Sequence, residues 1–224
     1  MYKKALLTLT VLVLAGSTTF AGQSTKEGVI TTGAGDGPRQ TLFLKAPTYV
    51  GSPVDRPAKL KTIYDNLGTG TNVYNCCTGW NVTGKTSQVG VQTWSATPFT
   101  PKTAATLTEI QIAIEWVNGQ NGAIVTLNTD KAGVPSTKVL QKWVFKNLHS
   151  AGTCCALSTG KLKTGIKLAK GKQYWVVAMC PTTTWAAWNL NSTGAVGNLA
   201  QQNNGGSWKV YANSTLGAMG LFGQ

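Results

Sequence analysis

The feature that most constrains this chain is the recurrence of short β-type segments from about Thr62 onward. Runs rich in Val, Ile, Thr and Trp are separated by Gly, Asn and Pro at short intervals. Such runs predict strands, and their close spacing predicts an all-β fold. We therefore expect residues 61–224 to form one antiparallel β-sandwich, jelly-roll-like in architecture. A hydrophobic content of 42%, including eight Trp, is enough for a packed core and excludes a disordered tail.

The clearest strand runs from Leu107 to Val117. Apolar side chains occupy one face and mostly polar side chains the other, which is the period-2 pattern of a half-buried strand. The first set is Ile110, Ile112, Ile114 and Trp116, and the second is Glu109, Gln111, Ala113 and Glu115. The turn residues 118–122 then predict a hairpin, with residues 123–128 as its second arm. Residues 129–135 are predicted to form another polar loop.

Further strands are expected in the second half of the chain. Gln173 to Cys180 reads as a central strand because it is almost continuously apolar. Residues 185–190 and 208–212 are also expected to be strands. Residues 139–148 fit both a helical face and a strand face, and the β context favours a strand.

The first residues have the features of a secretory signal peptide. Lys3 and Lys4 precede an apolar run from Ala5 to Ala15, which is too short to span a bilayer, and small residues follow. We expect residues 1–21 to be a signal peptide, cleaved after Ala21. Residues 22–60 are rich in Gly and Pro and have little periodicity, so we expect an extended, partly disordered leader. The mature protein is then exported, to the periplasm or the extracellular space, with no membrane span after processing.

Five cysteines lie in the exported part, where thiols oxidise: Cys76, Cys77, Cys154, Cys155 and Cys180. Five is odd, so at least one remains free or pairs with another chain. We expect a disulfide between the two doublets, for example Cys77 to Cys154, with bonds inside a doublet as the strained alternative. A zinc site is not expected because no CxxC spacing occurs.

Several motifs in the order found here resemble the choice-of-anchor R family of secreted bacterial surface domains. They are Ile63 to Gly68, Cys76 to Trp80, Thr97 to Pro101, Asp130 to Pro135, Gly152 to Cys155, Tyr174 to Ala178 and Trp188 to Leu190. The resemblance covers more than half of the chain. It implies an exported β-sandwich module displayed at or outside the cell envelope, and it implies no catalytic residues. The chain departs from the family in residues 205–224, which carry no surface-sorting signal.

The sequence offers few residues in an arrangement suited to acid–base catalysis. His149 is the only histidine, and an exposed loop position without an orienting carboxylate does not predict a catalytic triad. Glu109 and Glu115 would lie about 20 Å apart along one strand, too far for a glycosidase pair. Asp65 and Asp130 stay open as a pair, although turn formation explains both. A structural calcium ion bound by Asp65 or Asp130 is an alternative; no other cofactor is expected.

Lysines are distributed unevenly. All seven acidic residues precede Lys131, and the 94 residues from Lys131 to Gln224 contain ten lysines. We expect a basic patch that includes Lys138, Lys142, Lys146, Lys161 and Lys163. Lysines on sheet faces and edges commonly act against aggregation. The functional interpretation is attraction to an anionic surface polymer. A nucleic acid is not the expected partner, because Arg39 and Arg56 are the only arginines.

Aromatic and amide side chains near the C-terminus provide a candidate sugar-binding surface. An aromatic ring can stack on the apolar face of a sugar while amides bind its hydroxyls. The candidates are Trp185, Trp188, Asn189, Asn191 and Trp208. Trp185 and Trp188 are three residues apart, so on a strand they point to opposite faces. A core role for any one of these tryptophans is the competing interpretation.

The sequence therefore favours a secreted, non-enzymatic β-sandwich for cell-surface or matrix interaction that binds a glycan. A structural or adhesive subunit with a protein partner is the alternative, and a hydrolase of extracellular polysaccharide is the third hypothesis.

Overall fold

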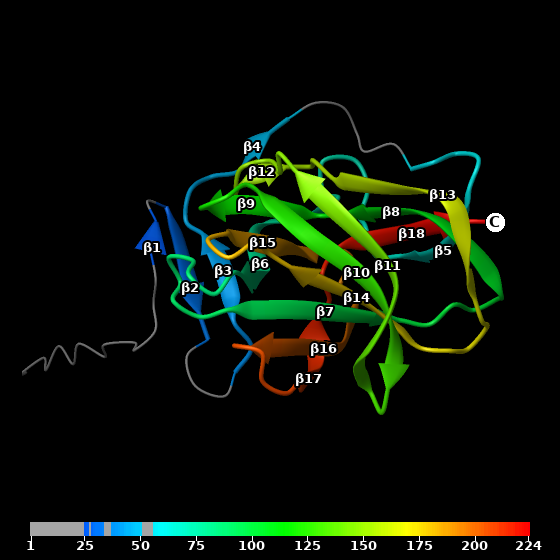
Figure 1. Cartoon of the computed structure of the whole chain (residues 1–224). Helices are drawn as coiled ribbons and strands as arrows, with labels where there is room; N and C mark the ends of the chain where they lie inside the picture. Colours follow the sequence, from blue (N-terminus) through cyan, green and yellow to red (C-terminus); the bar gives the residue numbers. More distant parts are fainter. Residues whose placement is uncertain (1–24, 27, 34–36, 51–55) are drawn as a thin grey trace, which may run out of the picture.

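The computed structural model describes residues 25–26, 28–33, 37–50 and 56–224 (Figure 1). The predicted signal peptide lies outside this part of the chain. The strands are β1 (Thr25–Lys26), β2 (Val29–Thr32), β3 (Gln40–Phe43), β4 (Thr48–Tyr49), β5 (Lys61–Asp65), β6 (Tyr74–Thr83), β7 (Thr93–Phe99), β8 (Ala105–Ile112), β9 (Ile114–Asn118), β10 (Gly122–Lys131), β11 (Val134–Lys146), β12 (Thr153–Cys154), β13 (Ser158–Leu168), β14 (Tyr174–Met179), β15 (Trp185–Asn191), β16 (Val196–Asn203), β17 (Lys209–Thr215) and β18 (Met219–Gly223). The described ranges contain no helix that is long and apolar enough to cross a membrane.

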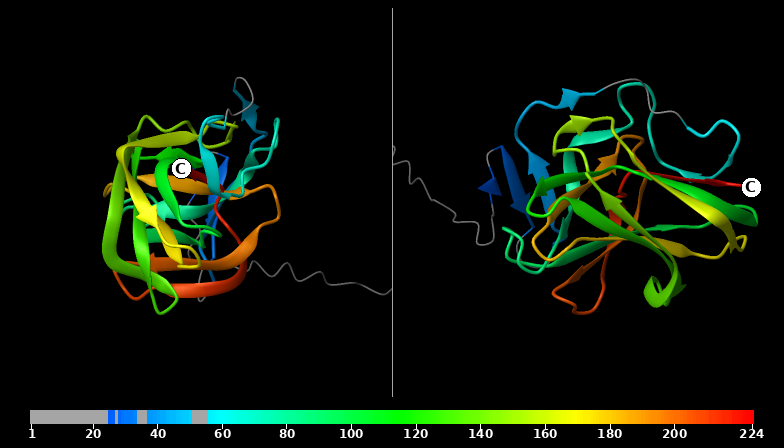
Figure 2. Two further views of the ribbon diagram at one scale, coloured as in Figure 1. Left: turned by 90° about the vertical axis from the view of Figure 1, so that its right-hand side faces the viewer. Right: turned by 45° about the horizontal axis from the view of Figure 1, so that its top comes forward.

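Two antiparallel sheets make up the body of the protein. The larger follows the order β1-β2-β3-β6-β7-β14-β10-β11, with β15 and β9 joined at β6, and β16 and β17 joined at β7. The smaller has the order β13-β8-β18-β5. Figure 2 shows the arrangement of these sheets from two further sides. The predicted all-β antiparallel sandwich is confirmed.

The main core lies between the sheets. Val125, Val176 and Ala178 from the larger sheet belong to one buried cluster with Ile110 and Leu221 from the smaller sheet. Alternating side chains of β10 and β14 enter this cluster, because neighbouring residues on a strand point to opposite faces. The remaining side chains of β10 and β14 point to the outer face of the larger sheet, where the candidate site lies.

Four of the strand predictions are confirmed, and the one at residues 208–212 is β17. β14 is a central strand, hydrogen-bonded to β7 on one side and β10 on the other. The segment with mixed helix and strand patterns is strand β11, whose Trp143 and Phe145 pack against the main core. The predicted strand at residues 185–190 is β15, and all of its residues are buried.

The predicted strand from Leu107 to Val117 is instead two strands in different sheets. β8 pairs with β13 and β18, whereas β9 pairs with β15. The chain changes sheets at Ala113, whose N–H donates to Ala218 and whose carbonyl accepts from Asn189. Both faces are buried, including Glu109 and Glu115, so the segment is not half-buried as predicted.

The predicted hairpin at residues 118–122 is also wrong, because β10 pairs with β11 and β14 and not with β9. The true hairpin is formed by β10 and β11. Its turn lies within residues 129–135, where a polar loop was expected. The turn residues Ala132 and Gly133 both have positive φ, 52° and 82°. Two consecutive residues with positive φ make a type I′ turn, which suits the twist of a hairpin.

Part of the predicted leader belongs to the larger sheet. β3 pairs with β6, and β2 pairs with β3. Val29 and Phe43 pack in a buried cluster with Trp185. The alternation of apolar and polar residues that marks a strand is hard to recognise in this part of the sequence, because threonines occupy inward-facing positions. Thr31 and Thr41 are fully buried, and both hydrogen-bond to the side chain of Asn81.

Candidate functional site

Two of the tryptophans predicted to bind sugar are core residues. Trp185 and Trp188 are both 0% exposed. They lie in different clusters, as their three-residue spacing predicts. The indole N–H of Trp188 donates to the carbonyl of Ala218 at 3.0 Å, and that of Trp185 donates to the hydroxyl of Thr41 at 3.1 Å. Their interpretation as ligand-binding residues is therefore corrected: the rings fill the core, and their polar atoms have internal partners.

The asparagines beside them are buried as well. Asn189 is 0% exposed and Asn191 is 4% exposed. The amide nitrogen of Asn191 donates to the carbonyls of Ala195 and Leu216, and its oxygen accepts from the N–H of Ala195. These bonds hold the loop after β15. Neither asparagine presents its amide on an aromatic surface, so this part of the prediction is also corrected.

Trp208, the remaining tryptophan candidate, is half-buried and lines a groove of about 280 Å³. A second half-buried tryptophan, Trp94 on β7, lines the same groove. Further lining residues include Thr126, Val139, Val177 and Gln202. Trp94 was not among the sequence candidates.

The groove lies on the outer face of the larger sheet. The register places Val177 opposite Ala96 on one side and Thr126 on the other. Trp208 packs against a cluster that contains Val177 and Ala96, and this cluster is separate from the core between the sheets. Five adjacent strands, β16, β7, β14, β10 and β11, contribute to the floor or sides. The turn ends of the β10–β11 and β16–β17 hairpins both lie at the bottom of Figure 1.

Two polar atoms of the lining residues are buried without a hydrogen-bond partner among the described residues. They are Nε1 of Trp94 and Oε1 of Gln202, which come from directly opposed positions of β7 and β16. One is a donor and the other an acceptor. A buried polar atom without a partner costs free energy. The groove therefore combines flat apolar rings with unused hydrogen-bonding capacity.

Lysines of the predicted basic patch are exposed on two edge strands. Lys138, Lys142 and Lys146 lie on β11 at the edge of the larger sheet, and Lys161 and Lys163 lie on β13 at the edge of the smaller. Lys142 is opposite Thr126, so it flanks the groove. A register shift places Val139, not Lys138, on the groove face. Lys161 forms an ion pair with Glu109 at 3.9 Å.

A disulfide joins the two cysteine doublets, as predicted, but its partners are Cys76 and Cys154. Cys77 follows Cys76 on β6 and points to the opposite, exposed side, which explains why it is not bonded to Cys154. Cys155 and Cys180 are buried free thiols. Burial raises the pKa of the Cys180 thiol well above its ordinary value, so this thiol stays protonated at neutral pH.

The remaining candidates have structural partners. Asp65 accepts from the guanidinium of Arg56 at 2.6 Å, and Asp130 accepts from the indole of Trp175 at 2.7 Å. Burial disfavours the charged form of Asp130, but hydrogen bonds from Trp175, Gly133 and Gln173 outweigh it and hold the pKa of the carboxyl below its usual value. Each carboxylate also accepts from a nearby backbone N–H, Asp65 from Leu67 and Asp130 from Gly133, which supports the turn-forming interpretation of both residues. His149 is exposed in a loop.

No family model matches the chain, and no curated protein was found that matches it in sequence. The resemblance to the choice-of-anchor R family therefore stays an expectation.

Proposed function

We propose that this protein is a secreted, non-enzymatic β-sandwich module that binds an acidic polysaccharide of a cell surface or matrix in the groove between Trp94 and Trp208. The observation that carries the proposal is the pair of half-buried tryptophans in one groove on an outer sheet face. Tryptophan rings suit the apolar faces of sugar rings. The N–H of Trp94 and the amide oxygen of Gln202 supply a donor and an acceptor for hydroxyl groups after small side-chain movements.

The charge of the surroundings favours an acidic polymer over a neutral one. Lys142 flanks the groove, and Lys138 and Lys146 are exposed on the same strand. No carboxylate occurs after Asp130 in the sequence, so β11, β14, β16 and β17 carry no negative side chain. A polysaccharide with carboxylate or sulfate groups would gain electrostatic attraction along β11 while its sugar rings contact the tryptophans.

The secreted, surface-associated part of the proposal is supported by two observations. A disulfide such as Cys76–Cys154 is typical of an oxidising compartment outside the cytosol. The sequence features of the first 21 residues, together with the resemblance to secreted surface domains, favour export. Non-enzymatic action is supported by the four acidic side chains of the described residues, which are engaged in internal hydrogen bonds and ion pairs and do not line the groove.

A glycan array that includes neutral, carboxylated and sulfated polysaccharides tests the proposal. We expect wild type to bind acidic members, and Trp94→Ala and Trp208→Ala each to lose most of that binding. Tyr49→Ala is the matched control because Tyr49 is an aromatic residue with 61% exposure that does not line this groove. Binding that is equal in wild type and both tryptophan variants, or no binding to any class, would contradict the proposal.

A protein partner is a second candidate, favoured by Cys77. Its thiol is exposed, whereas the other two free cysteines are buried. An exposed thiol in an oxidising compartment can form a disulfide with another chain.

A further inference from the structure

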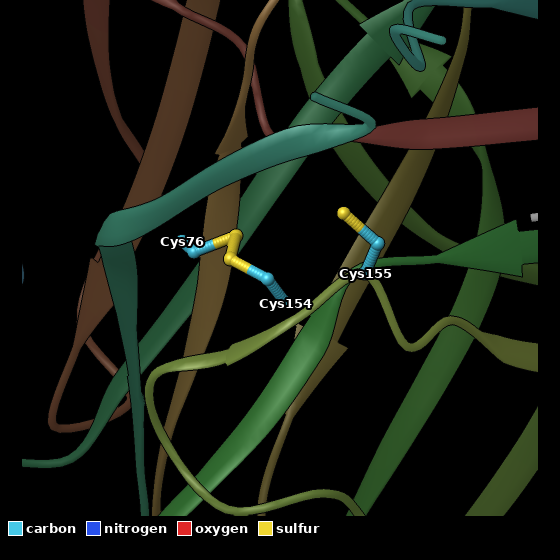
Figure 3. A group of neighbouring side chains, drawn as sticks. All are labelled: Cys76, Cys154 and Cys155. Carbon is cyan, nitrogen blue, oxygen red and sulfur yellow. A yellow bond between two sulfur atoms is a disulfide. The ribbon is translucent and has the colours of Figure 1, made fainter. Parts of the chain in front are cut away.

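Three cysteine sulfur atoms lie together beneath the surface near β6 and β12. The Sγ atoms of Cys76, Cys154 and Cys155 all lie within 4.8 Å of one another. Cys76 and Cys154 share the disulfide, and Figure 3 shows the side chain of Cys155 beside it with its sulfur on the same side of the loop. The third sulfur is a free thiol that donates to the carbonyl of Thr71 at 3.2 Å. The third cysteine is therefore already positioned next to the other two.

The spacing suits a single metal ion once the disulfide is open. Thiolate sulfurs bind at about 2.3 Å from a metal, so three of them around one ion in a plane lie roughly 4 Å apart. Separations below 4.8 Å need only small side-chain movements to reach that geometry. Within the described residues, no histidine or carboxylate belongs to this group, so its donors are sulfur alone. Thiolate donors suit Cu(I), zinc and iron–sulfur clusters. A set of three sulfurs favours Cu(I) over zinc, because zinc in structural sites takes four ligands.

The surrounding structure holds the loop and leaves a route to it. The N–H of Gly152 donates to Glu115, and the N–H of Ala156 donates to the hydroxyl of Tyr74, so both ends of the Cys154–Cys155 segment are fixed to buried side chains. Cys76 and Thr71 line a cavity of about 510 Å³ that opens to solvent. Cys154 is 1% exposed and Cys155 is 8% exposed, so an ion bound there would be shielded from water.

We propose that reduction of the Cys76–Cys154 disulfide converts this cluster into a binding site for one Cu(I) ion, held by Cys76, Cys154 and Cys155. Reduction by two molecules of a thiol transfers two electrons and two protons to the cysteine sulfurs and joins the two thiols in a disulfide. The ion then displaces the thiol protons as it binds. The site is closed in the oxidised protein, since two of its three sulfurs are bonded to each other, and this makes metal binding dependent on the redox state.

The test is a titration of the full chain, reduced and desalted without oxygen, with Cu(I) in the presence of a chromophoric Cu(I) chelator. We expect one equivalent of Cu(I) to be withheld from the chelator by the reduced protein and none by the oxidised protein. X-ray absorption of the loaded protein should report three sulfur scatterers. A competition in which Zn(II) displaces the bound Cu(I) would overturn the choice of ion.

One test variant and two matched control variants separate a folded site from general thiol binding. Cys155→Ser should lose the withheld equivalent, whereas Cys77→Ser and Cys180→Ser should retain it, because Cys77 is exposed on the opposite face of β6 and Cys180 lies in a different cluster. Far-UV circular dichroism shows whether the reduced protein is still folded. If it unfolds, its thiols become equivalent, and a loss with Cys77→Ser as large as with Cys155→Ser would overturn the proposal.

Discussion

The hydroxyl of Tyr74 lies 3.1 Å from Oε1 of Glu115, and this carboxyl group is fully buried. Its other oxygen accepts from the N–H of Gly152 at 2.7 Å. Burial removes water from the carboxyl and raises the pKa of Glu115 to about 8, against the partial compensation of these hydrogen bonds. The same burial and the adjacent carboxyl raise the pKa of Tyr74 far above its ordinary value. The carboxyl group of Glu115 is therefore mainly protonated and uncharged at pH 7.

This relationship predicts how stability depends on pH. The folded pKa of about 8 lies above the ordinary value of 4.5, so the folded state holds a proton that the unfolded state releases. The contribution of Glu115 to the free energy of unfolding is complete below about pH 4.5 and falls as pH rises toward 8, by about 1.4 kcal/mol per pH unit. Urea unfolding of wild type and Glu115→Gln between pH 5 and pH 9 measures it. In the variant, the free energy of unfolding should depend on pH much less steeply. An unchanged pH dependence would contradict the assignment of this effect to Glu115.

The burial of Trp188 predicts a large loss of stability on truncation. Its ring is fully buried, and a Cβ placed at Gly217 would lie only 2.5 Å from it, so the site is tightly packed. We expect Trp188→Ala to lower the free energy of unfolding by about 3–5 kcal/mol, as is typical of large core aromatics. Chemical denaturation measures this. Trp208→Ala, at a half-buried position, should cost clearly less, and equal losses would argue against the distinction between core and groove.

The strands that could be predicted from the sequence are those whose patterns reflect a single environment. β14 is continuously apolar because it is central, and β11 alternates because one of its faces is exposed. The residues around Ala113 misled the prediction for a physical reason. The chain moves from one sheet to the other there without a Gly or Pro, and the alternation continues through the crossing.

The candidate site was only partly predictable because it joins distant segments. Trp94 and Trp208 line one groove although more than a hundred residues separate them. Trp208 was identified from its amide-rich neighbourhood, whereas Trp94 lies among buried threonine, serine and alanine residues on β7. The available signal was a tryptophan between small or β-branched residues, Thr93, Ser95 and Ala96. The buried pair Trp185 and Trp188 shows why composition alone could not separate core aromatics from surface ones.

The position of Lys142 beside the groove predicts a salt-sensitive contribution of β11 to polymer binding. Replacing Lys138, Lys142 and Lys146 by Gln should weaken binding to an acidic polysaccharide roughly tenfold, because an exposed ion pair contributes about 0.2–1 kcal/mol. Elution from a heparin column with increasing salt measures the effect. The charge-matched control replaces Lys163, Lys167 and Lys170, which are exposed on or just after β13 of the smaller sheet and not on β11. Wild type that elutes at very low salt, or equal shifts in both variants, would contradict this prediction.

The exposure of Cys77 predicts covalent dimers after oxidation. Cys76 is committed to Cys154, and Cys155 and Cys180 are buried, so Cys77 is the free thiol most accessible to a second chain. Two thiols must approach to about 2 Å to form a disulfide, which buried sulfur atoms cannot do between folded chains. Non-reducing electrophoresis of air-oxidised protein should therefore resolve a dimer that disappears on reduction. Cys77→Ser should abolish the dimer and Cys180→Ser should leave it unchanged; a dimer that persists in Cys77→Ser would assign the linkage to another cysteine.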